Sequence, residues 1–313
     1  IDSRYCHNHS KNGEGPMNVV TAIKRSCNTW FYQVGLLTGA DPLTNMAARL
    51  GFGEKTGLPL KAESAGFLPT NAYMIQRYGH KIVGGDLANM CIGQGKVLAT
   101  PIQVCQSMAA VADGKNMAQV RLVKQVQDLN DRVVQAFPVQ TRKRIDLKDE
   151  IRSPVVKGMI AVVHGSSGTG SEAYVNKSIR IAGKTGTAQW KPDKEQNLAW
   201  FTGFLPADNP VYAFAVLYEG RPGENISGGK KAAPIVSEVF TKIYRNAPAE
   251  DPLLLAAKAP PKALPVGEEG EDEGGEDSSR KTKTKKAEPA EAPPPPPEEN
   301  KGPKSFFRRL FGR

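Results

Sequence analysis

The stretch from Ile179 to Trp190 holds the residues of this chain best suited to chemistry. Its two branched apolar residues predict a buried strand, which then runs into Lys184, Thr185, Gly186 and Thr187. Because side chains alternate along a strand, Lys184 should face one side and the two threonines the other. Gly186 leaves the backbone uncovered, so a second extended chain can lie alongside. This pattern suits a bound peptide whose carboxylate or developing oxyanion meets a cation and two hydroxyls.

A second triplet, Ser26-Cys27-Asn28, lies far upstream of Lys184. Serine and asparagine are also the residues that cap helices, so Ser26 and Asn28 can be explained without any chemistry. Likewise, Lys184 can be an ordinary lysine, because Lys-Thr-Gly is a common triplet. Neither triplet alone decides between the two explanations.

Together, the triplets match two of the three motifs of serine enzymes that react with penicillin, Lys-Thr-Gly and a Ser-x-Asn type triplet. The run from about Asn18 to Arg245 closely resembles the transpeptidase domain of class B penicillin-binding proteins, in particular the penicillin-binding protein 2 family of cell-wall elongation. The segments Gly85–Gln103 and Trp200–Phe204 agree with this resemblance.

The resemblance implies a mixed α/β (α+β) fold of the penicillin-binding and serine β-lactamase type. A central antiparallel sheet is packed between helices, beside a helical subdomain. Residues 1–246 are expected to form a transpeptidase domain that lacks its N-terminal part. Residues 247–313 are rich in Pro, Glu and Lys and are expected to form a disordered tail.

The resemblance also implies roles for the catalytic residues. Ser26 would relay a proton toward the leaving amine, and Lys184 would lend positive charge beside it. Asn28 would hydrogen-bond the substrate amide.

The substrate-binding residues implied by the resemblance lie on the Lys-Thr-Gly strand. Thr185 and Thr187 would bind the substrate carboxylate, and the Thr187 backbone N–H would form half of the oxyanion hole. Gly186 would keep the strand edge open.

The implied reaction is DD-transpeptidation, in which a serine acyl-enzyme crosslinks D-Ala-D-Ala stem peptides of peptidoglycan. A D-Ala-D-Ala carboxypeptidase or a β-lactamase-related hydrolase would share the motifs, and a non-catalytic scaffold of a cell-wall assembly is a third possibility. The implied partners are peptidoglycan stem peptides, β-lactam antibiotics and cell-wall elongation proteins, and no cofactor is implied.

The formal net charge of +10 favours anionic ligands or surfaces, and no nucleic-acid-binding motif accompanies it. We expect no nucleic acid partner. No apolar run in the sequence is long enough to span a membrane. We therefore expect a missing N-terminal anchor to hold the protein in the bacterial inner (cytoplasmic) membrane, with its catalytic domain on the periplasmic or extracytoplasmic side.

The cysteines leave their chemistry open. Four cysteines allow three pairings, or isolated buried thiols. Cys6, His7 and His9 offer zinc-ligand types at close spacing, but the spacing matches no recognised zinc motif.

Periodicity predicts the elements around the motifs. Helices are expected after the Ser-Cys-Asn triplet with a buried face of Trp30, Phe31, Val34 and Leu37, and from Pro101 to Asp113 behind a capping box. Further helices should open at Pro154 and end at Gly165, and run from Ala232 to Tyr244. A hairpin is expected within 120–137, and an antiparallel meander should join the Lys-Thr-Gly strand to strands 198–205 and 211–218.

The sequence departs from the family pattern at the motif that carries the nucleophilic serine. The family places Ser-x-x-Lys upstream of the Ser-x-Asn triplet, and no such motif precedes Ser26 here. Ser278-Ser279-Arg280-Lys281 has the right letters but lies in the expected tail.

A labelled penicillin is therefore expected to leave this 313-residue chain unmodified and to acylate a longer protein that includes the upstream motif. Intact-protein mass spectrometry measures the adduct. A covalent adduct on the 313-residue chain itself would contradict the assignment of the active site.

Overall fold

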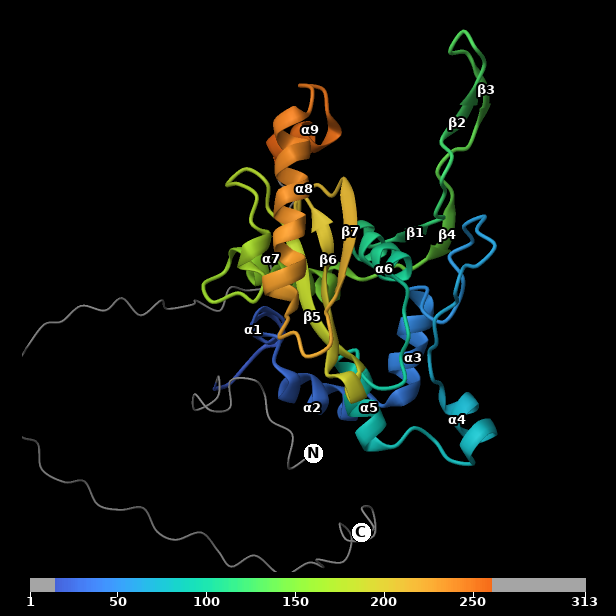
Figure 1. The fold of residues 1–313 in the computed structure, drawn as a ribbon, viewed down its shortest axis with the longest axis vertical. Helices are drawn as coiled ribbons and strands as arrows, with labels where there is room; N and C mark the ends of the chain where they lie inside the picture. Colours follow the sequence, from blue (N-terminus) through green and yellow to red (C-terminus); the bar gives the residue numbers. More distant parts are fainter. Residues whose placement is uncertain (1–14, 261–313) are drawn as a thin grey trace, which may run out of the picture. The chain divides into compact units, whose positions relative to one another are not determined.

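The sheet that carries the Lys-Thr-Gly motif is a three-stranded antiparallel meander. The computed structural model describes residues 15–260 (Figure 1). The strands are β5 (Ala182–Lys191), β6 (Gln196–Leu205) and β7 (Tyr212–Glu219), in the order β5-β6-β7. The predicted meander is confirmed. Within this sheet β5 is an outer strand, so one of its edges does not pair with β6.

Helices surround this sheet. The helices α6 (Pro101–Asp113), α7 (Asp149–His164) and α8 (Ala233–Asn246) all contact it, and α1 (Val19–Arg25) packs on α7. The core beneath includes Phe201 and Phe204, which have no exposed surface. The Phe214 ring stacks on Phe201 with 5.6 Å between ring centroids. The mixed α/β fold expected from the sequence is confirmed.

The helical region contains the remaining N-terminal elements. They are α2 (Asn28–Thr38), α3 (Ala40–Arg49), α4 (Asn71–Tyr78) and α5 (Gly84–Cys91). The prediction for α2 was right about the helix and right only in part about its buried face, because Phe31 packs against the core but Leu37 is 87% exposed. The buried residues of α2 are Tyr32 and Gly35. A Cβ at Gly35 would lie 1.9 Å from the Cys91 sulfur, so a close approach to α5 selects this face.

Helix α6 begins as its sequence predicts. The Thr100 hydroxyl accepts from the Gln103 N–H at 3.3 Å, and the Gln103 side-chain oxygen accepts from the Thr100 N–H at 2.8 Å. This reciprocal pair is the predicted capping box. The helix ends at Gly114, which adopts a left-handed conformation.

Helix α7 begins earlier than predicted. Pro154 was expected to open the helix, but the helix starts at Asp149 and Pro154 lies inside it. Asp149 and Glu150 are in the first turn, where acidic side chains stabilise the N-terminal end of a helix. Pro154 removes a single hydrogen bond near that end. The predicted stop at Gly165 is confirmed.

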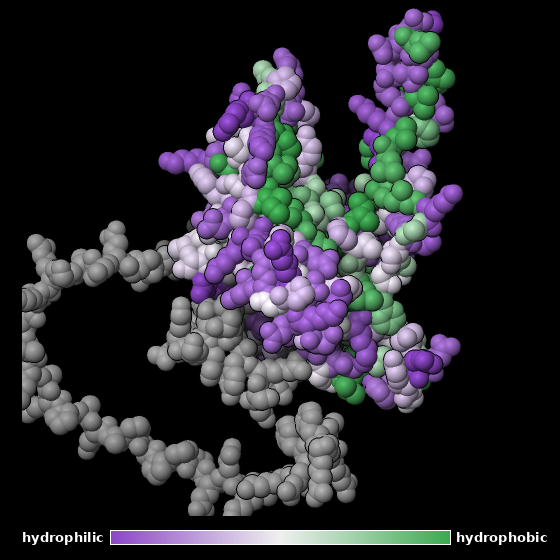
Figure 2. Space-filling model, in the orientation of Figure 1, coloured by the Kyte–Doolittle hydropathy of each residue, from purple (hydrophilic) through white to green (hydrophobic). Residues whose placement is uncertain are grey.

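A hairpin extends from the helical region. Strand β1 (Asn116–Ala118) pairs with β4 (Thr141–Arg144), and β2 (Gln125–Gln127) pairs with β3 (Val133–Ala136). The predicted hairpin within 120–137 is confirmed. Apolar side chains line the β2–β3 hairpin at the upper right of Figure 2.

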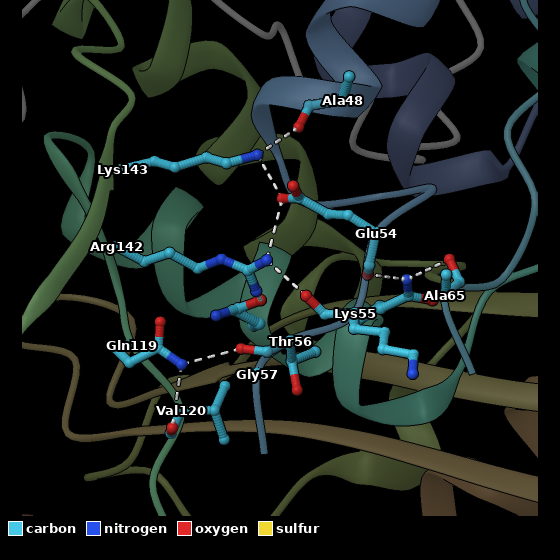
Figure 3. A network of polar contacts seen from close by, with 12 residues as sticks. Ala48, Glu54, Lys55, Thr56, Gly57, Ala65, Gln119, Val120, Arg142 and Lys143 are labelled. Atoms are coloured by element: carbon cyan, nitrogen blue, oxygen red, sulfur yellow. Dashed lines mark hydrogen bonds and ion pairs between the residues drawn. The ribbon is translucent and has the colours of Figure 1, made fainter. Parts of the chain in front are cut away.

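Polar contacts fasten the base of this hairpin to the glycine-rich loop after α3 (Figure 3). Glu54 pairs with Arg142 at 3.3 Å and also with Lys143. Gln119 donates to the Thr56 carbonyl oxygen at 2.9 Å. The loop is thus held by side chains from β4 and from the residue after β1.

The expected tail begins with ordered structure. Pro252–Lys258 form helix α9, capped by the Asp251 side chain, and Leu253 is fully buried. Disorder was therefore wrong for this segment, because a capped turn with one apolar anchor packs against the core. Residues 261–313, and the candidate zinc ligands Cys6, His7 and His9, lie outside the described residues.

Replacing Phe201 with alanine should lower the free energy of unfolding by about 3–5 kcal/mol, because the ring fills the centre of the core. Urea unfolding followed by circular dichroism measures the change. The control Val134→Ala, at a side chain that is 69% exposed, should change stability by less than about 0.5 kcal/mol. Equal effects of the two substitutions would contradict this description of the core.

Candidate active site

The Ser-x-Asn and Lys-Thr-Gly triplets meet in space. The Lys184 Nζ donates to the Ser26 Oγ at 2.7 Å and to the Thr185 carbonyl oxygen at 2.9 Å. The two hydrogen-bonded side chains are 158 residues apart in sequence. The Lys184 side chain therefore links the two triplets.

Ser26 occupies a turn between two helices. It ends α1 in the left-handed region, with φ 54° and ψ 48°, which is unfavourable for a residue with a Cβ. Its N–H bonds the Ile23 carbonyl oxygen at 3.2 Å. The turn directs the chain into α2, for which Cys27 is the N-cap residue. Ser26 is thus the C-cap residue of α1, which its backbone N–H caps, so the capping explanation holds in part for Ser26. Neither Ser26 nor Asn28 caps α2 with its side chain.

Asn28 is the first residue of α2 and is half-buried. Within residues 15–260, no hydrogen bond of its side chain is seen. The amide therefore keeps both donor and acceptor capacity, two residues after Ser26 in sequence.

The environment of Lys184 changes its acidity. Burial lowers the pKa of the Lys184 ammonium from 10.5 to about 8, because the charged form loses hydration. Part of the residue remains exposed, but its ammonium end is enclosed. Such a lysine is mostly protonated at neutral pH and can exchange a proton with a neighbouring hydroxyl near its pKa.

The two threonines of the strand have separate contacts. The Thr185 hydroxyl lies 2.9 Å from the Thr169 hydroxyl. The Thr187 hydroxyl accepts from the Gly228 N–H at 3.3 Å. Gly228 begins a π-helical turn, Gly228–Ala232, which leads into α8.

The loop that contains Gln94 reaches the same strand. Gly93 and Gly95 have φ of 72° and 81°, so the loop turns sharply on both sides of Gln94. The Gln94 Nε2 donates to the Thr187 carbonyl oxygen at 3.1 Å. This contact brings the glycine-rich loop onto β5.

Two residues at the site were missed by sequence reasoning, Thr169 and Gln94. Glycines on both sides of a polar residue were the available signal in each case.

His164 is the last residue of α7. Its Nε2 accepts from the Ile181 N–H at 2.9 Å, which requires an unprotonated nitrogen. Burial, with Arg180 nearby, lowers the pKa of His164.

Within residues 15–260, no group of three or more His, Cys, Asp or Glu side chains is placed to hold a metal ion. Among the described helices, none has the length and hydropathy needed to cross a bilayer.

A Lys-Thr-Gly strand at a sheet edge, with its lysine bonded to the serine of a Ser-x-Asn triplet, is typical of penicillin-reacting serine enzymes. Residues 3–241 match the family model described as the penicillin binding protein transpeptidase domain. The chain belongs to this family.

Individual relatives agree. The chain is 32% identical over 250 residues to the peptidoglycan D,D-transpeptidase MrdA of Haemophilus influenzae, covering 74% of this chain and 37% of that protein. The Acinetobacter baumannii MrdA is 29% identical, covering 86% of this chain and 42% of that protein. The chain thus spans less than half the length of these curated relatives.

Solved structures show the same fold. Pseudomonas aeruginosa PBP2 in complex with WCK 5153 has a TM-score of 0.62 and 33% identity, covering 73% of this chain and 47% of that chain. Helicobacter pylori PBP2 in complex with MreC has a TM-score of 0.61 and 31% identity, covering 75% of this chain and 41% of that chain.

The lowered pKa of Lys184 predicts a pH dependence of stability. Between about pH 8 and 10.5 the unfolded chain binds a proton that the folded chain has lost, so folding becomes more favourable as pH rises. The unfolding free energy of the unmodified chain, minus that of Lys184→Met, should therefore increase from neutral pH to about pH 10. Urea titrations of both proteins at several pH values measure this difference.

The control Lys242→Met removes an exposed lysine but keeps Lys184, so it should retain the gain in unfolding free energy at higher pH. A constant difference between the unmodified chain and Lys184→Met across this range would contradict a lowered Lys184 pKa.

Proposed function

We propose that the protein containing this chain is a serine DD-transpeptidase that crosslinks D-Ala-D-Ala stem peptides during cell-wall elongation. The observation that carries the proposal is the 2.7 Å bond between Lys184 and Ser26. It joins the two family motifs at an unpaired strand edge, where an extended peptide can add.

Acyl transfer needs proton movement near the leaving group. We assign this role to Ser26, with Lys184 as the neighbouring cation that stabilises its alkoxide character. Asn28 would hold the substrate amide with the free donor and acceptor of its side chain. The acylated serine would come from a Ser-x-x-Lys motif upstream of this chain.

The substrate strand would lie along the open edge of β5. Thr187 would supply a backbone N–H to the oxyanion, and Thr185 and Thr187 would donate hydroxyl hydrogen bonds to the terminal carboxylate. Gly186 would keep the edge free of side-chain bulk. Gln94 already donates to the Thr187 carbonyl oxygen, so a bound peptide would share this acceptor or displace Gln94.

Curated relatives named D,D-transpeptidases favour crosslinking over a carboxypeptidase, a β-lactamase-related hydrolase or a scaffold. The proposed ligands are stem peptides and β-lactams. A solved structure of penicillin-binding protein A from Mycobacterium tuberculosis, 26% identical to this chain, is a ceftriaxone acyl-enzyme complex. The PBP2–MreC complex supports elongation proteins as partners, and we propose a membrane-anchored protein with its catalytic domain outside the cytoplasm.

The proposal predicts that a longer protein with the upstream motif reacts with a fluorescent penicillin. Lys184→Met should slow its acylation roughly 100-fold, because the proton relay loses its cation. Gel fluorescence over time measures the rate. The matched variant Lys242→Met, at a lysine that is 69% exposed, should react as the unmodified protein does.

Rapid labelling of Lys184→Met would contradict the role of Lys184, and no labelling of the unmodified longer protein would contradict the proposed activity. Mass spectrometry after incubation with D-Ala-D-Ala stem peptides shows whether the acyl group is transferred to the amine of a second peptide or to water. Crosslinked dimers support transpeptidation, whereas free D-Ala with no dimers would show a carboxypeptidase.

A further inference from the structure

The Thr169 hydroxyl lies between the two segments that carry the site. Its Oγ1 is 2.9 Å from the Thr185 Oγ1 and 3.4 Å from the Lys24 carbonyl oxygen. Lys24 is in the last turn of α1, just before Ser26. One hydroxyl thus touches both the strand expected to bind the carboxylate and the helix that leads to Ser26.

Tight packing fixes the position of Thr169. The next residue, Gly170, donates its N–H to the Val162 carbonyl oxygen of α7 at 2.9 Å. A Cβ at Gly170 would lie 2.8 Å from the Phe201 ring, and a Cβ at Gly229 would lie 2.3 Å from the Thr169 carbonyl oxygen. The backbone at Thr169 and at the next residue is therefore held by the π-helical turn and by the core. A hydroxyl on such a rigid support is suited to orient a neighbour.

The single proton of the Thr169 hydroxyl limits the possible arrangements. If Thr169 donates to the Lys24 carbonyl oxygen, the contact with Thr185 requires that Thr185 donate to Thr169. If Thr169 donates to Thr185 instead, the Thr185 proton is free to point elsewhere. An ionised carboxylate only accepts hydrogen bonds, so its binding at Thr185 requires the second arrangement.

We propose that Thr169 is a positioning residue that orients the Thr185 hydroxyl proton toward the terminal carboxylate of the substrate. The inference rests on the proposed function and adds a determinant of specificity to it. Donation from Thr169 polarises the Thr185 hydroxyl and strengthens its hydrogen bond to the anion. A neutral carboxamide at the same end of the peptide gains less, because it lacks the charge.

The test compares two N-acyl-D-Ala-D-Ala peptides, one ending in a free carboxylate and the other in a carboxamide. The protein is the longer one with the upstream motif, and kcat/KM is measured for each peptide by release of the terminal residue. Thr169→Val should lower the ratio of kcat/KM for the carboxylate peptide to kcat/KM for the carboxamide peptide about fivefold, which is the effect of one hydrogen bond. Thr169→Ser keeps the hydroxyl and should hold the ratio within about twofold.

The control Thr44→Val removes another hydroxyl hydrogen bond, to the Ala40 carbonyl oxygen in α3, and should leave the ratio unchanged. An unchanged ratio in Thr169→Val would overturn the inference. If both rates also fell equally, the role of Thr169 would be purely structural. Failure of the unmodified protein to react with either peptide would overturn the proposed function itself. Thermal unfolding of each variant confirms that the fold is retained.

Discussion

The hydrogen bond from the Lys184 ammonium to the Ser26 hydroxyl depends on packing far from both residues. Helix α1 rests on α7, and α7 rests on β5, so the serine and the lysine are held by a continuous series of contacts. Gly158 of α7 makes the first contact close, since a Cβ there would lie 2.9 Å from the Ile23 side chain. A bulkier residue at Gly158 would therefore shift Ser26 relative to the strand.

The enclosed ammonium has an energetic cost that the fold must offset. Removing a lysine from water disfavours its charged form, which is the cause of its lowered pKa. The core beneath the sheet provides the stabilisation, with Phe201 and Phe204 fully buried. The surroundings of the lysine and the serine have low polarity. Electrostatic interactions are stronger there than in water. These conditions favour the proton transfers that acyl transfer requires.

The same strand has different surroundings at each of its residues. Lys184 contacts the turn after α1, Thr185 contacts the glycine-rich loop after α7, and Thr187 contacts the turn before α8 and the loop after α5. Segments from four parts of the chain therefore converge on β5. The strand edge is where the site is assembled, and each threonine already has a hydrogen-bonding neighbour that a substrate must accommodate.

Several features could be predicted from sequence because they depend on neighbouring residues. The capping box of α6, the meander and the hairpin follow from local hydrogen bonding and alternation. The start of α7 and the buried face of α2 could not be predicted in this way. Pro154 is tolerated inside α7 near its first turn, and the close approach of Gly35 to Cys91 turned Leu37 outward.

The sequence by itself identified the two triplets and their resemblance to a known family, because neither needs coordinates. Tertiary structure alone decided that Ser26 and Lys184 touch, that burial lowers the lysine pKa to about 8, and that Thr169 and Gln94 reach the same strand. The reason is physical. Distances between residues remote in sequence, and the hydration of a charged group, are set by the packing of the whole domain rather than by local sequence.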